Sequence, residues 1–173
     1  LIPGPRLVDD AYITFRYARH IVEGTGFVYN PGERVLGTTT PLYTLLLTGL
    51  SLLTGSRDFP RLAFLINAPV GALAVGLLYL LSRKFSDHRL PASAVALLWA
   101  VAPYGVTFAI GGMETELTIA LLLGVAYAHV TERSSLMATL SALAVLARPD
   151  TALLLVLVWL SLLLARKAIP WRE

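Results

Sequence analysis

Two adjacent carboxylates, Asp9 and Asp10, open a polar segment that continues to Arg19 with the sequence DDAYITFRYAR. Everything after about Pro41 is mostly apolar. Adjacent carboxylates repel each other and compete for one local field, so together they attract cations or a substrate that can donate a proton. The pattern therefore predicts chemistry at the surface of an apolar domain.

The composition indicates the class of protein without any motif. Of the 173 residues, 56% are hydrophobic and 14% are charged, whereas a soluble domain usually carries about 25% charged residues. The mean hydropathy is +0.70. The net charge of +3 lies in short clusters beside apolar runs, which suits membrane orientation better than nucleic-acid binding. We therefore expect an integral membrane protein, without disulfides because the chain has no cysteine.

Five apolar stretches have lengths near that of a membrane-spanning helix, which needs roughly 17 to 25 residues. They cover residues 61–82, 91–110, 115–130, 135–147 and 151–165. Pro103 and Gly105 are expected to kink the second stretch near its far end, and Asn67 in the first is expected to form an interhelical hydrogen bond. The pattern predicts an all-α integral membrane protein, built as a multi-span helical bundle of about five spans.

Another apolar segment, residues 41–54, is shorter than a span and is typical of a helix that lies at the membrane interface. With this helix on the surface, the basic loop 83–89 falls on the same side as Arg133 and residues 166–167. The positive-inside rule then makes that side cytoplasmic. If residues 41–54 spanned the membrane instead, the basic loop would lie outside with little positive charge to compensate, so we favour the surface helix.

Under that topology four polar features gather on the outer face. They are the segment Asp9-Asp10, the loop 33–41, the turn 111–116 and the segment Arg148-Pro149-Asp150. Polar groups at membrane depth usually mark a site or a pathway. A transporter would place its charges near the bilayer midplane, whereas these spans are almost free of charge. The arrangement favours interfacial chemistry over the alternative, a non-enzymatic polytopic membrane protein such as a transporter or a scaffold subunit.

Several of these residues also have a simpler structural interpretation. Residues 9–23 are typical of an amphipathic surface helix, which one aspartate can cap, although one cap does not account for both. Glu114 can favour the positive N-terminus of the next helix, and Glu116 suits a charge in its first turn. Arg148 can be an end-of-helix residue paired with Asp150. One of the threonines 38–40 can cap the helix that begins at residue 41.

Three motifs resemble, in the same order and at similar spacing, polytopic glycosyltransferases of the GT-C fold. They are DDAYITFRYARHIVEGTGFVYNPGERVLGTTTPLYTLLL, GGMETEL and LARPDTALLL. The likeness covers nearly the whole chain and is greatest to bacterial members related to the mycobacterial terminal arabinofuranosyltransferases and to the protein mannosyltransferase superfamily. In those enzymes a first span precedes the acidic loop, so we interpret this chain as an N-terminal fragment that lacks that span.

The resemblance implies roles for particular residues. Asp9 would be the general base that deprotonates the acceptor hydroxyl. Asp10 would tune or orient it, or help to hold a divalent cation, although one carboxylate pair does not complete a coordination sphere. Arg148, with Arg16 as a second candidate, would bind the phosphate of the leaving lipid. The remaining substrate-binding candidates are Thr38, Thr39 and Glu114.

The resemblance also implies an organisation and a reaction. Residues 1–60 would form an external loop with juxtamembrane helices and the acidic motif, and residues 61–173 the transmembrane bundle. The protein would move a sugar from a polyprenyl-phosphate donor to a hydroxyl of a glycan, lipid or protein acceptor. We expect a multi-pass protein of the bacterial plasma membrane that acts on cell-envelope glycans, with its active site on the outer face.

Overall fold

The computed structural model describes residues 9–33 and 37–168, and within them the chain is all-helical. The helices are α1 (Ala11–Val22), α2 (Pro41–Thr54), α3 (Phe59–Phe85), α4 (Arg89–Val101), α5 (Pro103–Ile110), α6 (Thr115–Val130), α7 (Ser134–Ala147) and α8 (Thr151–Ala168). The all-α class predicted from the sequence is confirmed for this part of the chain.

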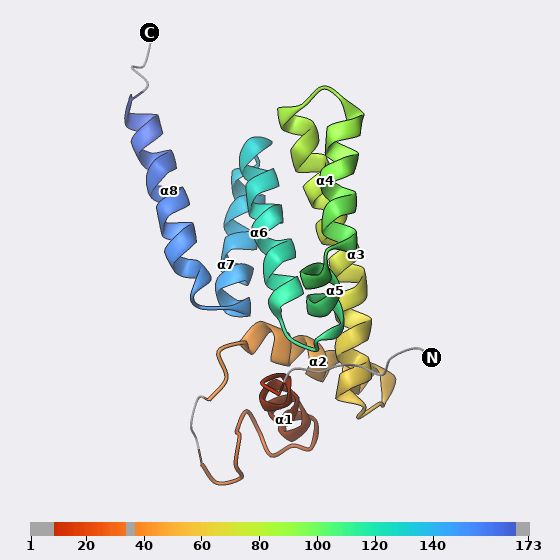
Figure 1. Ribbon diagram of the computed structural model, residues 1–173. Coiled ribbons are helices and arrows are strands. Elements are labelled where there is room, and N and C mark those ends of the chain that lie inside the picture. The colour runs from red at the N-terminus through yellow and green to blue at the C-terminus, as the bar shows by residue number, and fades with distance from the viewer. Residues whose placement is uncertain (1–8, 34–36, 169–173) are drawn as a thin grey trace.

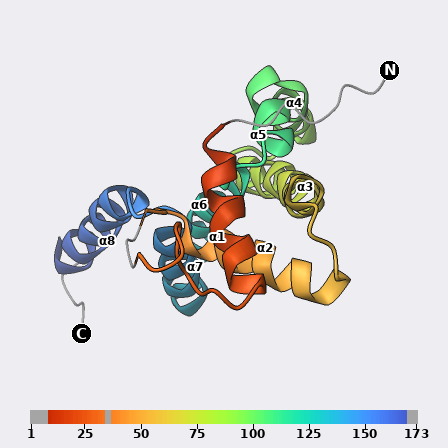
Figure 2. The same cartoon turned by 90° about the horizontal axis from the view of Figure 1, so that it is seen from below.

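The helices form an upright bundle that is closed at one end by two crosswise helices. Helices α3, α4, α6, α7 and α8 run up and down in turn, whereas α1 and α2 lie across the lower end (Figure 1). Seen from that end, α1 crosses over α2 (Figure 2). Helix α6 packs against both α3 and α7, and α8 contacts α7. The end covered by α1 is therefore also where α6 and α8 begin and where α7 finishes.

Helix α1 buries one face and ends at a glycine. Phe15 and Ala18 lie in the core shared with α2 and α3, and the ring of Phe15 stacks on Phe59 of α3 with centroids 6.3 Å apart. The chain leaves the helix where Gly24 adopts a φ of +77°, a left-handed conformation that favours glycine. The amphipathic helix predicted for residues 9–23 is confirmed, with its first helical residue two positions later.

Helix α2 has the bounds of the apolar segment 41–54. Pro41 occupies its first turn, where a missing N–H leaves no bond unmade, and Gly55 ends it with a φ of +68°. Tyr43 and Leu47 on its inner face are wholly buried in the common core. The helix crosses the end of the bundle (Figure 2). Its position at a membrane interface stays a prediction.

By length and composition, α3 is the one helix of the described chain able to cross a membrane alone, and the α4–α5 pair qualifies if it is one span bent by 54°. The bend follows Ala102, as the kink prediction expects. Pro103 has no N–H to donate to the carbonyl oxygen of Trp99, and a Cβ on Gly105 would lie 2.8 Å from that oxygen. Helices α6 and α7 are apolar but shorter, so a bundle of about five spans remains a prediction.

Two groups of charged residues lie at opposite ends of the bundle. The α3–α4 and α6–α7 turns, with the basic loop 83–89 and Arg133, lie at the upper end in Figure 1. The turns that carry Glu114 and Arg148 lie at the lower end, beside α1. The predicted gathering of polar features at one end is present for Asp9-Asp10, the turn 111–116 and the segment 148–150, whereas residues 34–36 of the loop 33–41 lie outside the described residues. The side of the membrane that this end faces and the division at residue 60 stay predictions.

Candidate functional site

The turn between α5 and α6 is held in place by a hydrogen bond from α3. Gly112 takes a φ of +78°, a conformation that favours glycine, just before α6 begins. Asn67 of α3 is wholly buried, and its Nδ2 donates to the carbonyl oxygen of Met113 at 2.9 Å. Asn67 forms the predicted hydrogen bond, but its acceptor lies in the α5–α6 turn and not in another helix as expected, so the bond fixes the residue that precedes Glu114. Glu114 makes no capping hydrogen bond to α6, so any effect that it has on this helix is electrostatic.

Glu114 and Arg148 form an ion pair that joins this turn to the end of α7. Glu114 is 4% exposed, and its Oε1 lies 3.6 Å from Nη1 of Arg148. Arg148 also holds Asp150: Nη2 lies 3.0 Å from Oδ2, and Nε donates to Oδ1 at 3.2 Å. The interpretation that Arg148 pairs with Asp150 is confirmed. The structure adds a second partner, so one guanidinium joins a buried carboxylate to an exposed one.

Burial raises the pKa of Glu114 above its ordinary value of 4.5, because the charged carboxylate loses its contact with water. The like charges of Asp150 and Asp10 also raise it, whereas the positive charge of Arg148 lowers it. Glu114 therefore holds its proton to a higher pH than an exposed glutamate does. When Glu114 is ionised, the positive charge of Arg148 compensates for its buried negative charge.

The stability of the protein should consequently fall as the pH rises above about 4.5, because the folded state keeps the Glu114 proton where the unfolded chain has released it. The fall ends once the pH passes the raised pKa. Thermal unfolding of wild type and Glu114→Gln between about pH 4 and pH 8 measures the effect. The variant should lose this part of the pH dependence. Glu132→Gln, an exposed acid on the α6–α7 turn, should retain it, and identical profiles for all three proteins would contradict the assignment.

Asp9 and Asp10 lie exposed immediately before α1. Their carbonyl oxygens accept the N–H groups of Tyr12 and Ile13, both at 3.1 Å, whereas the side chain of Asp10 makes no capping bond. The cap interpretation is therefore wrong for Asp10. The negative charge of Asp10 contributes to the raised pKa of Glu114. Among the described residues, no group of three or more histidine, aspartate or glutamate side chains is arranged to hold a metal ion.

A chain of threonine hydroxyls connects α1 to the start of α2. The Oγ1 atoms of Thr14 and Thr38 lie 3.2 Å and 3.1 Å from Oγ1 of Thr40, and all three residues are buried. Thr40 makes no side-chain capping bond to α2. Thr38 therefore takes part in packing, whereas Thr39 is exposed. The substrate-binding roles of Thr38 and Thr39 stay predictions.

Arg16 is engaged with the loop that follows α1. Its Nη2 donates to Oδ1 of Asn30 at 3.1 Å, and its guanidinium carbon lies 4.4 Å from the centre of the Tyr29 ring. Asn30 in turn donates to Glu33 at 3.1 Å. The structure thus gives Arg16 a set of partners different from those of Arg148. A phosphate-binding role for Arg16 stays a prediction.

Two buried residues near the turn were not identified by sequence reasoning as parts of a site. Tyr43 of α2 is wholly buried beside Asn67 and Glu114, and burial raises the pKa of its phenol, which keeps it neutral. Glu116, interpreted as a first-turn charge, is only 1% exposed and faces Gly71 of α3. In the sequence, each of the two is a polar residue within an apolar stretch. Such a residue is expected to be buried, but the sequence does not predict which residues it contacts.

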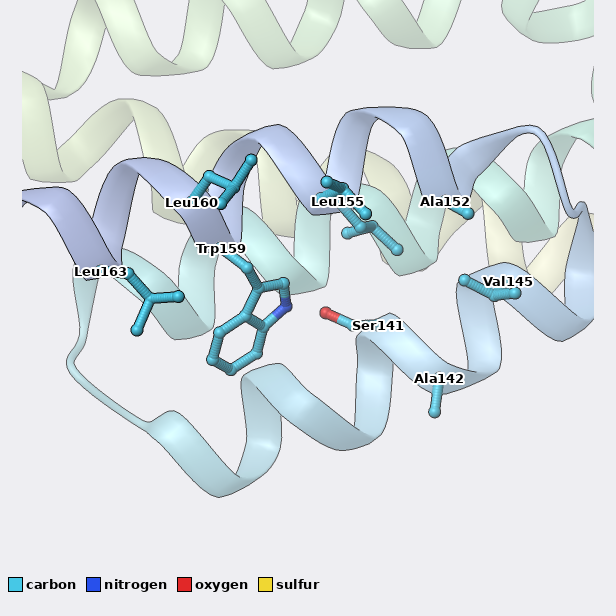
Figure 3. Close-up of a pocket in the computed structure, with 9 residues that line it drawn as sticks. Ser141, Ala142, Val145, Ala152, Leu155, Trp159, Leu160 and Leu163 are labelled. Atoms are coloured by element: carbon cyan, nitrogen blue, oxygen red, sulfur yellow. The ribbon is translucent and has the colours of Figure 1, made fainter.

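A cavity of about 410 Å³ lies between α7 and α8. Trp159 and Leu155 of α8 face Ser141 of α7 across it (Figure 3). The hydroxyl of Ser141 donates to the carbonyl oxygen of Met137 at 2.8 Å, and the lining contains no titratable side chain. The cavity is therefore a gap between apolar helices and offers no group for catalysis.

Comparison with known proteins shows a likeness to a mycobacterial enzyme. The chain is 28% identical over 122 residues to the terminal β-(1→2)-arabinofuranosyltransferase of Mycobacterium tuberculosis (strain ATCC 25618 / H37Rv), an alignment that covers 67% of this chain and 20% of that protein. The chain thus spans about a fifth of the length of this relative. No family model matches the chain, and no solved structure matches it. The likeness supports a function of the glycosyltransferase type, and the apolar helix α3 indicates membrane association.

Proposed function

We propose that this chain is part of a membrane glycosyltransferase of the GT-C type, which transfers a sugar from a polyprenyl-phosphate donor to an acceptor hydroxyl at the outer face of the membrane. The likeness to an arabinofuranosyltransferase supports the reaction class. The observation that carries the proposal is the Glu114–Arg148 ion pair at the end of the bundle that α1 covers, the helix that Asp9 and Asp10 immediately precede. It brings carboxylates and a guanidinium together where an apolar donor lipid would present its phosphate.

In the proposed reaction, Asp9 takes the proton of the acceptor hydroxyl as that oxygen attacks the anomeric carbon of the donor sugar. The bond between the anomeric carbon and the phosphate oxygen breaks, and the lipid phosphate leaves with the electron pair. A single displacement of this kind inverts the anomeric configuration. Asp10 orients Asp9 and contributes negative charge beside Glu114, while Arg148 stabilises the charge that develops on the leaving phosphate.

Arg148 is suited to this role because its two partners differ in their exposure to solvent. Glu114 is buried and holds the guanidinium from within, whereas Asp150 has a side chain that is 60% exposed. Exposed ion pairs contribute little to stability, at most about 1 kcal/mol, so a phosphate can take the place of Asp150 at low cost. A guanidinium binds two phosphate oxygens at once, which fixes the leaving group as well as neutralising it.

The alternative is a non-enzymatic polytopic membrane protein, a transporter or a scaffold subunit. A transport path would require charged groups that line a route near the midplane. The ion pairs of the described residues instead join Glu114 and Asp150 to Arg148, and Glu23 to Arg57. Both sets lie at the end of the bundle that carries α1 and α2 (Figure 1). Interfacial chemistry therefore accounts for more of the structure than transport does.

The test is a transfer assay on the full-length protein in membranes supplied with radiolabelled polyprenyl-phosphate sugars, with nucleotide sugars offered separately. The proposal predicts a labelled glycan together with release of polyprenyl phosphate, and no transfer from a nucleotide sugar when the lipid carrier is absent. Membranes without the protein are the control. Transfer from nucleotide sugars alone would overturn the donor class, and failure with every lipid-linked pentose and hexose would favour the non-enzymatic alternative.

A further inference from the structure

A second, separate pocket lies between α3, the bend from α4 to α5, and the start of α6. Its volume is about 310 Å³, which is within the lower range of small-ligand sites. The wall formed by α3 consists of small residues at helical spacing, including Ala68, Gly71 and Ala72, and Ala109 contributes from α5. Small side chains on both sides leave the space open, so an apolar ligand of modest width fits between the helices.

One acidic side chain lines this otherwise apolar pocket. Glu116 is 1% exposed, and its Oε2 has no hydrogen-bond partner among the described residues. Its Oε1 would lie 3.0 Å from a Cβ at Gly71, so the carboxyl group occupies the space that the missing side chain of Gly71 leaves beside α3. A buried polar atom without a partner is costly, and a buried charge without one is more so. The unsatisfied oxygen therefore favours a ligand that can donate hydrogen bonds to it.

One further feature of the lining favours a positive charge. The pocket includes Trp99, whose indole face attracts cations more strongly than other aromatic rings do. The carboxyl group of Glu116 and the aromatic ring of Trp99 thus act in the same direction.

The part of the chain that the structure describes supplies no cation here. None of the residues that line the pocket is lysine, arginine or histidine, and the ion pairs of the described residues leave Glu116 out. A hard metal ion is a poor match, because calcium and magnesium require about six oxygen ligands and the lining provides one carboxyl group. An organic cation with apolar substituents meets both the charge and the apolar walls.

We propose that this pocket binds a primary alkylammonium group, with its N–H groups donating to Glu116, its charge beside the Trp99 ring and its alkyl chain against the small residues of α3. Glu116 lies in the first turn of α6, whose positive end stabilises the ionised carboxylate once the cation is bound. Such a ligand is either a soluble amine or the ammonium headgroup of a lipid. The proposal is independent of the glycosyltransferase function, because it concerns binding at a different set of residues.

The test is titration of the full-length protein, in phosphatidylcholine nanodiscs, with n-hexylammonium, followed by saturation-transfer NMR. We expect saturable binding to wild type and about tenfold weaker binding of 1-hexanol, which has the same chain without the charge. Glu116→Gln should also weaken n-hexylammonium binding about tenfold. The matched control, Glu132→Gln, removes an exposed acid at the other end of α6 and should leave the affinity unchanged.

A second variant keeps the proposal testable if Glu116→Gln does not fold, as judged by thermal unfolding. Ala72 is exposed on the pocket wall, so Ala72→Leu should fill the space without entering the core and should abolish binding. Equal affinity for 1-hexanol, retained binding in Glu116→Gln or Ala72→Leu, or no saturable binding to wild type would each overturn the proposal. Repeating the titration in nanodiscs that contain phosphatidylethanolamine distinguishes a lipid headgroup from a soluble amine as the natural occupant. A weaker apparent affinity for n-hexylammonium there means that the lipid headgroup competes for the pocket and is the occupant. An unchanged affinity identifies a soluble amine.

Discussion

Replacing Asp9 by Asn is expected to lower the rate of sugar transfer by a factor of about 10² to 10⁴, the usual contribution of a general base. Asparagine keeps the size and polarity of the side chain but cannot accept the proton of the acceptor hydroxyl. Because Asp9 is exposed and precedes α1, the change should leave folding and membrane insertion intact. The measurement is single-turnover transfer by the full-length protein, with donor binding determined separately.

Asp10→Asn should have a smaller effect, within about fivefold, because the side chain acts through its charge on neighbouring groups and exposed charges couple weakly. Asp87→Asn, an exposed acid on the far α3–α4 turn, is the matched control and should transfer at the wild-type rate. If the large loss falls on Asp10→Asn instead, the base is Asp10. If both variants transfer normally, the aspartates are surface charge and the catalytic assignment is wrong.

Arg148→Met is expected to reduce transfer by about 100-fold, because it removes the cation proposed to stabilise the leaving phosphate. It should also lower the free energy of unfolding by about 2 kcal/mol, since the buried carboxylate of Glu114 is then left without its partner. Arg148→Lys should recover much of the stability but little of the transfer, because an ammonium group lacks the two-pronged geometry of a guanidinium. Arg133→Met, an exposed arginine at the opposite end, is the control.

A double variant separates the two effects of Arg148. In Glu114→Gln with Arg148→Met, no buried charge remains, so the stability should return toward that of wild type while transfer stays low. The coupling free energy from this cycle measures the ion pair itself. Transfer at the wild-type rate in Arg148→Met would remove Arg148 from the proposed mechanism, and unchanged stability would show that Glu114 is already compensated by other means.

Local features of the fold were predictable because they depend on neighbours in the chain. The bounds of α2 follow from Pro41 and Gly55, and the bend after α4 follows from Pro103. Gly24 ends α1, as its place after the amphipathic pattern predicts. In each case a backbone preference of one residue acts on the adjacent turn of helix. These signals need no knowledge of what the helix packs against.

The order of the amino acids already defines the class of this protein: an apolar, all-α chain with a polar motif at its start and charged turns between its helices. The contacts of the site come from helix packing, through which Glu114 meets Arg148, Asn67 holds the turn that carries Glu114, and Glu116 faces α3 in a pocket of its own. These contacts could not be predicted because long stretches of chain separate the partners. Helix periodicity states which residues share a face, but the packing of whole helices sets which faces meet.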